Sequence, residues 1–147
     1  MSQELIDSID ARLLSGVSIL TTSADESRQS FKIWQSLADE AGIPASGPFV
    51  ANSYDAAFMM ALAIEAVQSS NRDRISDGLR RISGPEGQVI YPGEYAKAAA
   101  ILKSGGSINY EGASGTVDFD AKGDIAGFVS INKVVDGQWV AQLMTSQ

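Results

Sequence analysis

The residues most able to bind a metal ion form an acidic cluster, DFDAKGD, in the last third of the chain. Asp118, Asp120 and Gly123 occupy three positions of a calcium-binding loop, in which oxygen ligands alternate along a turn. Lys122 stands where an oxygen ligand is required, and Val129 stands where the loop needs a bidentate glutamate. The cluster therefore predicts a β-turn with solvated or amide-capping aspartates, and no metal site.

Catalytic chemistry is restricted by the absence of histidine and cysteine from the sequence. A Ser-His-Asp triad, a Cys-His dyad and a sulfur-bound zinc are all impossible without them. The glycine-rich GPEG and GASG segments lack the spacing that binds phosphate, and Ser114 is followed directly by Gly115, which a nucleophile elbow does not allow. We expect no catalytic residues, no cofactor and no enzyme, although a site of carboxylates, or of lysine and tyrosine, stays an open alternative.

The composition sets the size of the fold and excludes two classes of partner. A chain of 147 residues with 44% hydrophobic residues is long enough for a single domain, or for part of one. Eighteen acidic residues against 11 basic residues give a net charge of -7, which repels nucleic acids and anionic membrane surfaces. We expect neither to be a partner.

The first ten residues, MSQELIDSID, are acidic where an export signal needs a basic start and an apolar stretch. The chain as written is therefore expected to have no signal peptide. The longest apolar run covers residues 56–64 and ends at Glu65, well short of the roughly 20 residues that span a bilayer. This run predicts a buried helix.

Helices dominate the first two thirds of the predicted structure. Leucine and isoleucine at helical spacing predict a helix over residues 5–14 that ends at Gly16, followed by a strand at 17–20 and a polar connection at 21–25. An amphipathic helix is expected over residues 31–41.

A long helix follows, which Asn52 or Ser53 caps and which reaches about Ser69. Because its apolar residues occupy nearly every side, this helix must be buried all round. Asn71 is expected to cap the next helix, and another helix should run from Tyr95 to the glycine pair at 105–106.

The end of the chain is rich in strand-forming residues. Residues 128–135 and 139–143 predict two strands, and Asp136-Gly137 between them is a strong two-residue hairpin signal. With one further strand near the start, the layout fits either an α+β domain or a piece of a larger α/β protein.

Three segments resemble a known family, and their order along the chain agrees with it. INYEGASGTVDFDAKGDIAG at residues 108–127, SGPFVANSYDAAFMMALAIEA at 46–66 and VSINKVVDGQWV at 129–140 are similar to stretches of the receptors for branched-chain amino acids. These receptors are type I periplasmic binding proteins, with two α/β lobes joined by three crossovers and a ligand in the cleft between them. The resemblance implies an α/β fold, namely the C-terminal part of this two-lobed architecture, helix-rich with a terminal β-hairpin.

The resemblance also implies how this chain is divided. Residues 1–21 and 127–147 would belong to one lobe and residues 22–126 to the other, with crossovers near residues 21–24 and 125–128. Most of the family's ligand cleft has no counterpart in the sequence, so the chain is expected to be an incomplete receptor.

Four residues are expected near the ligand because of this resemblance. Phe49 matches an aromatic residue that packs on the ligand's side chain, and Asn52, Tyr54 and Asp55 lie at the start of the following helix. The alternative for Phe49 is packing in the core or between lobes. Tyr54 and Asp55 can equally be the entry and the cap of the helix.

The implied function is that of a solute-binding receptor component of an ABC importer for branched-chain or related amino acids. The implied partners are a small-molecule ligand and the permease subunits, and the full-length protein would work in the periplasm. A ligand-sensing regulatory module of the same fold is the alternative, since a fold does not determine a function. Exposed apolar surface on the apolar helix predicts a possible homodimer.

Overall fold

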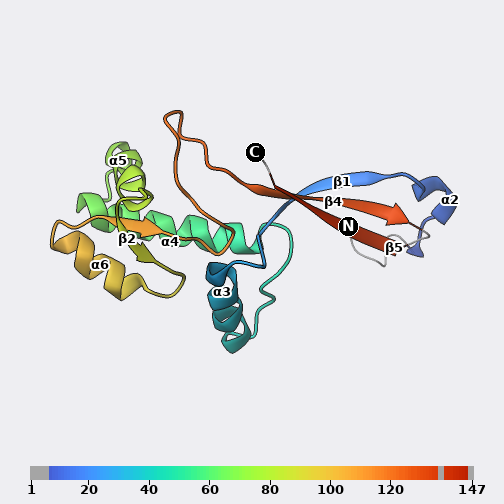
Figure 1. Ribbon diagram of the computed structural model, residues 1–147, viewed down its shortest axis with the longest axis horizontal. Helices are drawn as coiled ribbons and strands as arrows, with labels where there is room; N and C mark the ends of the chain where they lie inside the picture. The colour runs from blue at the N-terminus through green and yellow to red at the C-terminus, as the bar shows by residue number, and fades with distance from the viewer. Residues whose placement is uncertain (1–6, 136–137, 146–147) are drawn as a thin grey trace.

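The computed structural model describes residues 7–135 and 138–145, which form a sheet and a helix-rich body. Figure 1 shows the sheet extending away from the helices as an arm, with the short helix α2 (Ala11–Leu14) at its far end. The arm contains β1 (Ser18–Ser23), β4 (Phe128–Val135) and β5 (Gln138–Thr145). The body contains α3 (Gln29–Glu40), α4 (Val50–Val67), α5 (Arg72–Ile82), β2 (Gln88–Ile90), α6 (Tyr95–Lys103) and β3 (Ile108–Tyr110).

The arm is an antiparallel sheet in the order β1-β4-β5, so strands from the two ends of the chain are joined. Ser23 lies opposite Phe128 at the end nearest the body. In the hairpin, Val135 pairs with Gln138, which confirms the terminal β-hairpin that the sequence predicts. The Asp136-Gly137 turn itself lies outside the described residues.

The first strand is longer than predicted. The sequence indicates a polar connection from residue 21, but β1 continues to Ser23 and the chain leaves the sheet at Ala24. Pairing with β4 explains the difference, because Thr21 lies opposite Ser130 and the two side-chain oxygens are 2.9 Å apart. β-branched threonines suit such a half-buried, paired surface.

The start of α4 also differs from the prediction. The helix begins at Val50 after a turn in which the Val50 N–H donates to the Gly47 carbonyl oxygen over 3.3 Å. Phe49 is the N-cap residue and has a left-handed backbone, with φ of 65°, which is rare for a bulky residue. The predicted caps, Asn52 and Ser53, are wrong because both lie inside the first turn of the helix.

The long apolar helix α4 is covered on one side and open on the other, so the prediction of burial all round is wrong. Helices α5 and α6 both pack against α4, and Gly78 of α5 lies so close to Ala63 that an added Cβ would clash with its carbonyl group. On the uncovered side Met60 is 47% exposed, and Ala56, Ala57 and Ile64 are exposed as well. None of the helices in the described part of the chain has the length and apolar character that a membrane span needs.

Helices α3, α5 and α6 confirm the predicted helices, and the Asn71 side chain caps α5 by accepting a hydrogen bond from the Asp73 N–H over 3.0 Å. The two parallel strands β2 and β3, in which Ile90 lies opposite Tyr110, were not predicted. Each has three residues, which is too short to show a periodic pattern in the sequence.

The body has two adjoining apolar cores. The larger core lies between α4, α5, α6 and the β2–β3 pair, and the smaller core surrounds Trp34 of α3, whose Nε1 donates to the Ala45 carbonyl oxygen over 3.1 Å. Tyr54 connects the two, because its ring centroid lies 4.4 Å from that of Trp34 and 5.6 Å from that of Phe58. The Tyr54 ring thus joins α3 to α4.

Candidate functional site

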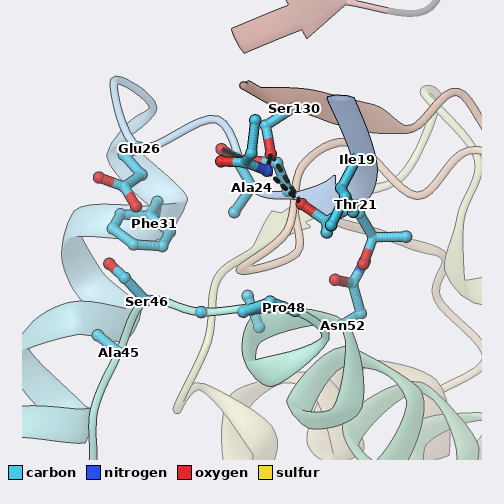
Figure 2. A pocket seen from close by; sticks show the side chains of 15 residues that line it. Ile19, Thr21, Ala24, Glu26, Phe31, Ala45, Ser46, Pro48, Asn52 and Ser130 are labelled. Carbon is cyan, nitrogen blue, oxygen red and sulfur yellow. Dashed lines mark hydrogen bonds between the residues drawn. The ribbon is translucent and has the colours of Figure 1, made fainter. Parts of the chain in front are cut away.

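A cavity of about 390 Å³ lies where the arm joins the body. Figure 2 shows the cavity from close by, with strand residues Thr21 and Ser130 on one side and Pro48 and Asn52 on the other. Its described lining is Ile19, Thr21, Thr22, Ser23, Ala24, Glu26, Phe31, Ala45, Ser46, Gly47, Pro48, Ala51, Asn52, Ser130 and Asn132. Both structural parts of the chain therefore contribute to a single concave surface.

The strand side of the cavity has a hydroxyl–amide cluster, which consists of Thr21, Ser130 and Asn132. The Asn132 Nδ2 donates to Thr21 Oγ1 over 3.1 Å and to Ser130 Oγ over 3.2 Å. Thr21 and Ser130 are direct cross-strand partners, and Asn132 lies two residues along β4 and so on the same face of the sheet. The cluster can both donate to and accept from a small polar ligand.

The helix side of the cavity is partly apolar. Phe31, from α3, is 2% exposed, and Ala51 and Asn52 come from the first turn of α4. Among the described residues that line the cavity, Glu26 has the one charged side chain. A concave lining that combines apolar surface with polar side chains can hold a small organic molecule.

The four residues predicted near a ligand lie in different places. Asn52 lines the cavity. Phe49 follows Pro48 of the lining and is 59% exposed. Tyr54 accepts a hydrogen bond from the Gly93 N–H over 2.8 Å, and burial and then the charge of Asp55 raise its pKa.

Asp55 lies in the interior of the body, 3% exposed. Its carboxylate accepts hydrogen bonds from the Tyr110 hydroxyl over 2.7 Å, from the Ala113 N–H over 2.8 Å, and from the N–H and hydroxyl of Ser114 over 2.7 and 2.6 Å. The structure thus brings Asn52 into the described lining and places Phe49, Tyr54 and Asp55 outside it. The ligand contact of all four stays a prediction.

The sequence did not single out the hydroxyl–amide cluster. Its signal is the pair of polar residues Ser130 and Asn132, two positions apart in a strand that is apolar except for these and Lys133, together with the matching Thr21 of β1. Period-two alternation places such residues on one face of a sheet. The alternation does not show which strands are neighbours. The cluster forms only because β1 pairs with β4.

The acidic cluster at residues 118–124 forms the predicted β-turn. Asp120 Oδ1 accepts hydrogen bonds from the Lys122 N–H over 2.8 Å and from the Asp124 N–H over 2.9 Å. Hydrogen bonding to the backbone N–H of Asp124 is the main reason that the pKa of Asp120 is lowered. No group of three or more carboxylate side chains that could hold a metal ion occurs within the described ranges.

Comparison with known proteins gives two matches. Residues 16–136 match the family described as the receptor family ligand binding region. Over 74 residues the chain is 32% identical to the chemotactic signal transduction system substrate-binding protein BasB of Halobacterium salinarum. That alignment spans 50% of this chain and 18% of the relative. No solved structure matches the chain significantly.

Proposed function

Because this chain belongs to the receptor family ligand binding region, we propose that it is part of a solute receptor for branched-chain or related amino acids. The family and the relative are named for ligand and substrate binding, and the chain is a binding protein, not an enzyme. The amino acid specificity is the proposed part. It is motivated by the similarity of residues 108–127 to the corresponding stretch of such receptors.

The observation that best supports the proposal is the convergence of polar groups from the arm and the body on one cavity. Thr21, Ser130 and Asn132 approach it from the sheet, and Asn52 approaches it from α4. Neutral hydroxyl and amide groups can bind the ammonium and the carboxylate of an amino acid. The apolar patch around Phe31 suits a hydrocarbon side chain, and we propose that the exposed Phe49 covers the ligand from the edge of the cavity.

The same geometry supports a division into two lobes. We assign residues 1–21 and 127–147 to one lobe and residues 22–126 to the other, so that the cavity lies at their junction. Ligands that bind between lobes commonly close a hinge. In support of this division, the described sheet ends close to these bounds, since β1 ends at Ser23 and β4 begins at Phe128.

Isothermal titration calorimetry with leucine, isoleucine and valine tests the proposal, with glucose as the unrelated solute. We expect heat of binding with at least one of these amino acids and a loss of affinity of about tenfold or more in Asn132→Ala and Asn52→Ala, since a hydrogen bond to a charged group contributes about 1.5–3 kcal/mol. Gln35→Ala, on the exposed face of α3, is the matched control. No heat with any of the three, from either the chain or the full-length protein, would refute the proposal.

Two roles of such a receptor remain to be distinguished. In an importer the receptor docks on ABC permease subunits outside the cytoplasmic membrane, and we propose this role and a periplasmic location. The alternative is a ligand-sensing module, which is favoured by the chemotactic signal transduction system in the name of the relative. Crosslinking of the full-length protein in cells distinguishes them, because an importer receptor is recovered with permease subunits and a sensor with a signal transducer.

A further inference from the structure

The loop at residues 111–116, here called the clasp loop, connects β3 with the segment that returns to the arm. Asp55 of α4 holds the loop in the body through its hydrogen bonds to the N–H groups of Ala113 and Ser114. Gly112 is required at this approach, because a Cβ there would lie 2.6 Å from Asp55 Oδ2. The loop is therefore fixed on α4 by a buried carboxylate.

The clasp loop also holds the first connection between arm and body, residues 24–28. Arg28 Nη2 lies 2.7 Å from Glu111 Oε2, and the Thr116 hydroxyl donates to the same oxygen over 3.1 Å. The side chains of Arg28 and Glu111 are 35% and 18% exposed, so solvent screens this ion pair less than a surface pair. Arg28 immediately precedes α3, and the ion pair thus fixes the entry of the chain into the body.

At its other end the clasp loop contacts the arm. A Cβ at Gly115 would lie 3.1 Å from Cε2 of Phe128, so the phenylalanine ring packs directly on the glycine backbone. Phe128 is the first residue of β4, opposite Ser23 at the end of β1. The clasp loop consequently touches the connection that leaves the arm and the residue at which the chain re-enters it.

We propose that the clasp loop sets the orientation of the arm relative to the body, with Asp55, Arg28 and Glu111 as positioning residues. The orientation determines the separation of the hydroxyl–amide cluster from Asn52, which lie on the two sides of the cavity. The effect on solute binding rests on the proposed function, whereas the role of the clasp loop in orienting the arm is independent of it.

The electrostatics around Glu111 make the Arg28 contact sensitive to substitution. Burial and then the charge of Glu111 raise the pKa of Asp118, so Asp118 is a like-charged neighbour of Glu111. Without the arginine, Glu111 keeps this repulsive neighbour and loses its cation. The clasp loop would thereby lose its ion pair to the first connection.

Distance measurement between spin labels tests the proposal without a ligand. The sequence has no cysteine, so Arg74→Cys on α5 and Lys133→Cys on β4 give one nitroxide on the body and one on the arm. Double electron–electron resonance should give a narrow distance distribution in the otherwise unchanged chain. Arg28→Met, which keeps the aliphatic stem, should broaden the distribution and shift its mean.

Two further variants separate orientation from stability. Lys97→Met removes an ion pair of 2.9 Å within the body, to Glu94, and should leave the distribution unchanged. Arg28→Glu combined with Glu111→Arg restores opposite charges and should recover the narrow distribution. An unchanged distribution in Arg28→Met, or broadening by Lys97→Met to the same extent, would overturn the proposal. Loss of cooperative unfolding in Arg28→Met would also overturn it, because the residue would then maintain the fold as a whole.

If Arg28→Met changes the distance distribution as expected but calorimetry shows no binding of leucine, isoleucine or valine, the proposed function is refuted. The proposed role of the clasp loop in orienting the arm then stands. If these amino acids bind and Arg28→Met leaves both the distance distribution and the affinity unchanged, the proposed role of the clasp loop is refuted and the proposed function stands.

Discussion

The Tyr110 hydroxyl donates a hydrogen bond to Asp55 Oδ1 over 2.7 Å, and so joins β3 to α4 in the interior of the body. Tyr110 is fully buried and stacks on Phe58, with ring centroids 4.8 Å apart. Together with the clasp loop, the hydroxyl satisfies a carboxylate that forms no ion pair within the described part of the chain. A buried charge is tolerated when hydrogen bonds replace its hydration, and this network meets that requirement.

We expect Asp55→Asn to lower the free energy of unfolding by about 2–3 kcal/mol, because hydrogen bonds to a charged group are stronger than neutral ones and the amide places a donor opposite the loop N–H groups. Urea unfolding measures the change. Asp39→Asn, on the exposed face of α3, removes the same charge and should leave the stability almost unaltered. Equal stability of the two variants would contradict the prediction.

The stability of the fold should fall at alkaline pH because of Tyr110. Burial, and then the negative charge of Asp55, raise the pKa of Tyr110 far above its ordinary value of 10.0. The folded chain therefore keeps a proton that the unfolded chain releases, so this stabilisation is complete below the unfolded pKa and is lost as the pH rises above it.

Above about pH 10 the free energy of unfolding should fall by about 1.4 kcal/mol per pH unit because of Tyr110. Tyr110→Phe should remove this part of the pH dependence. Unfolding free energies at a series of pH values for both proteins give the difference, in which the raised pKa values of Tyr54 and Tyr95 cancel. Tyr95→Phe, near the protein surface, is the control and should remove less of the slope. Parallel pH profiles for the unchanged chain and Tyr110→Phe would exclude the assignment.

We expect Gly112→Ala to destabilise the fold by about 2 kcal/mol or more, since overpacking a filled site forces backbone or side-chain shifts. The added Cβ would lie 2.6 Å from Asp55 Oδ2. Gly84→Ala is the matched control, because the space around Gly84 is open, and its effect should stay within about 0.5 kcal/mol. Thermal unfolding monitored by circular dichroism compares the two variants, and similar midpoints would argue against a tight approach of Asp55.

The exposed side of α4 should cause the chain to self-associate, as the sequence predicts for its apolar helix. Met60 is 47% exposed there, beside exposed alanines, and uncovered apolar surface favours association. Sedimentation velocity should show a dimer that grows with concentration. Met60→Lys should weaken it, whereas Gln35→Lys, the same charge change on α3, should not; a monomer at all concentrations would disprove the prediction.

Local pattern determined most of the elements of this protein. Each of three predicted features depends on residues only a few positions apart. They are the amphipathic helix α3, the Asn71 cap of α5 and the β-turn in which Asp120 accepts hydrogen bonds from backbone N–H groups. The long apolar helix was recognised for the same reason, as were the strands of the terminal hairpin.

The site depended on contacts between residues that are distant in the chain. Thr21 and Ser130 are 109 residues apart, and only the pairing of β1 with β4 places their hydroxyls on one wall of the cavity. Asp55 was expected near a ligand because of the family resemblance, and the structure shows that its carboxylate accepts hydrogen bonds from a loop 58 and 59 residues further on.

The sequence by itself determined most of the helices, the hairpin, the class of chemistry and the family, because these follow from residue types and their short-range order. The tertiary structure decided which polar residues share a cavity and which side of α4 stays open. The physical reason is that strand pairing and helix packing minimise exposed apolar surface over the whole chain, and this choice of neighbours is not encoded in any single segment.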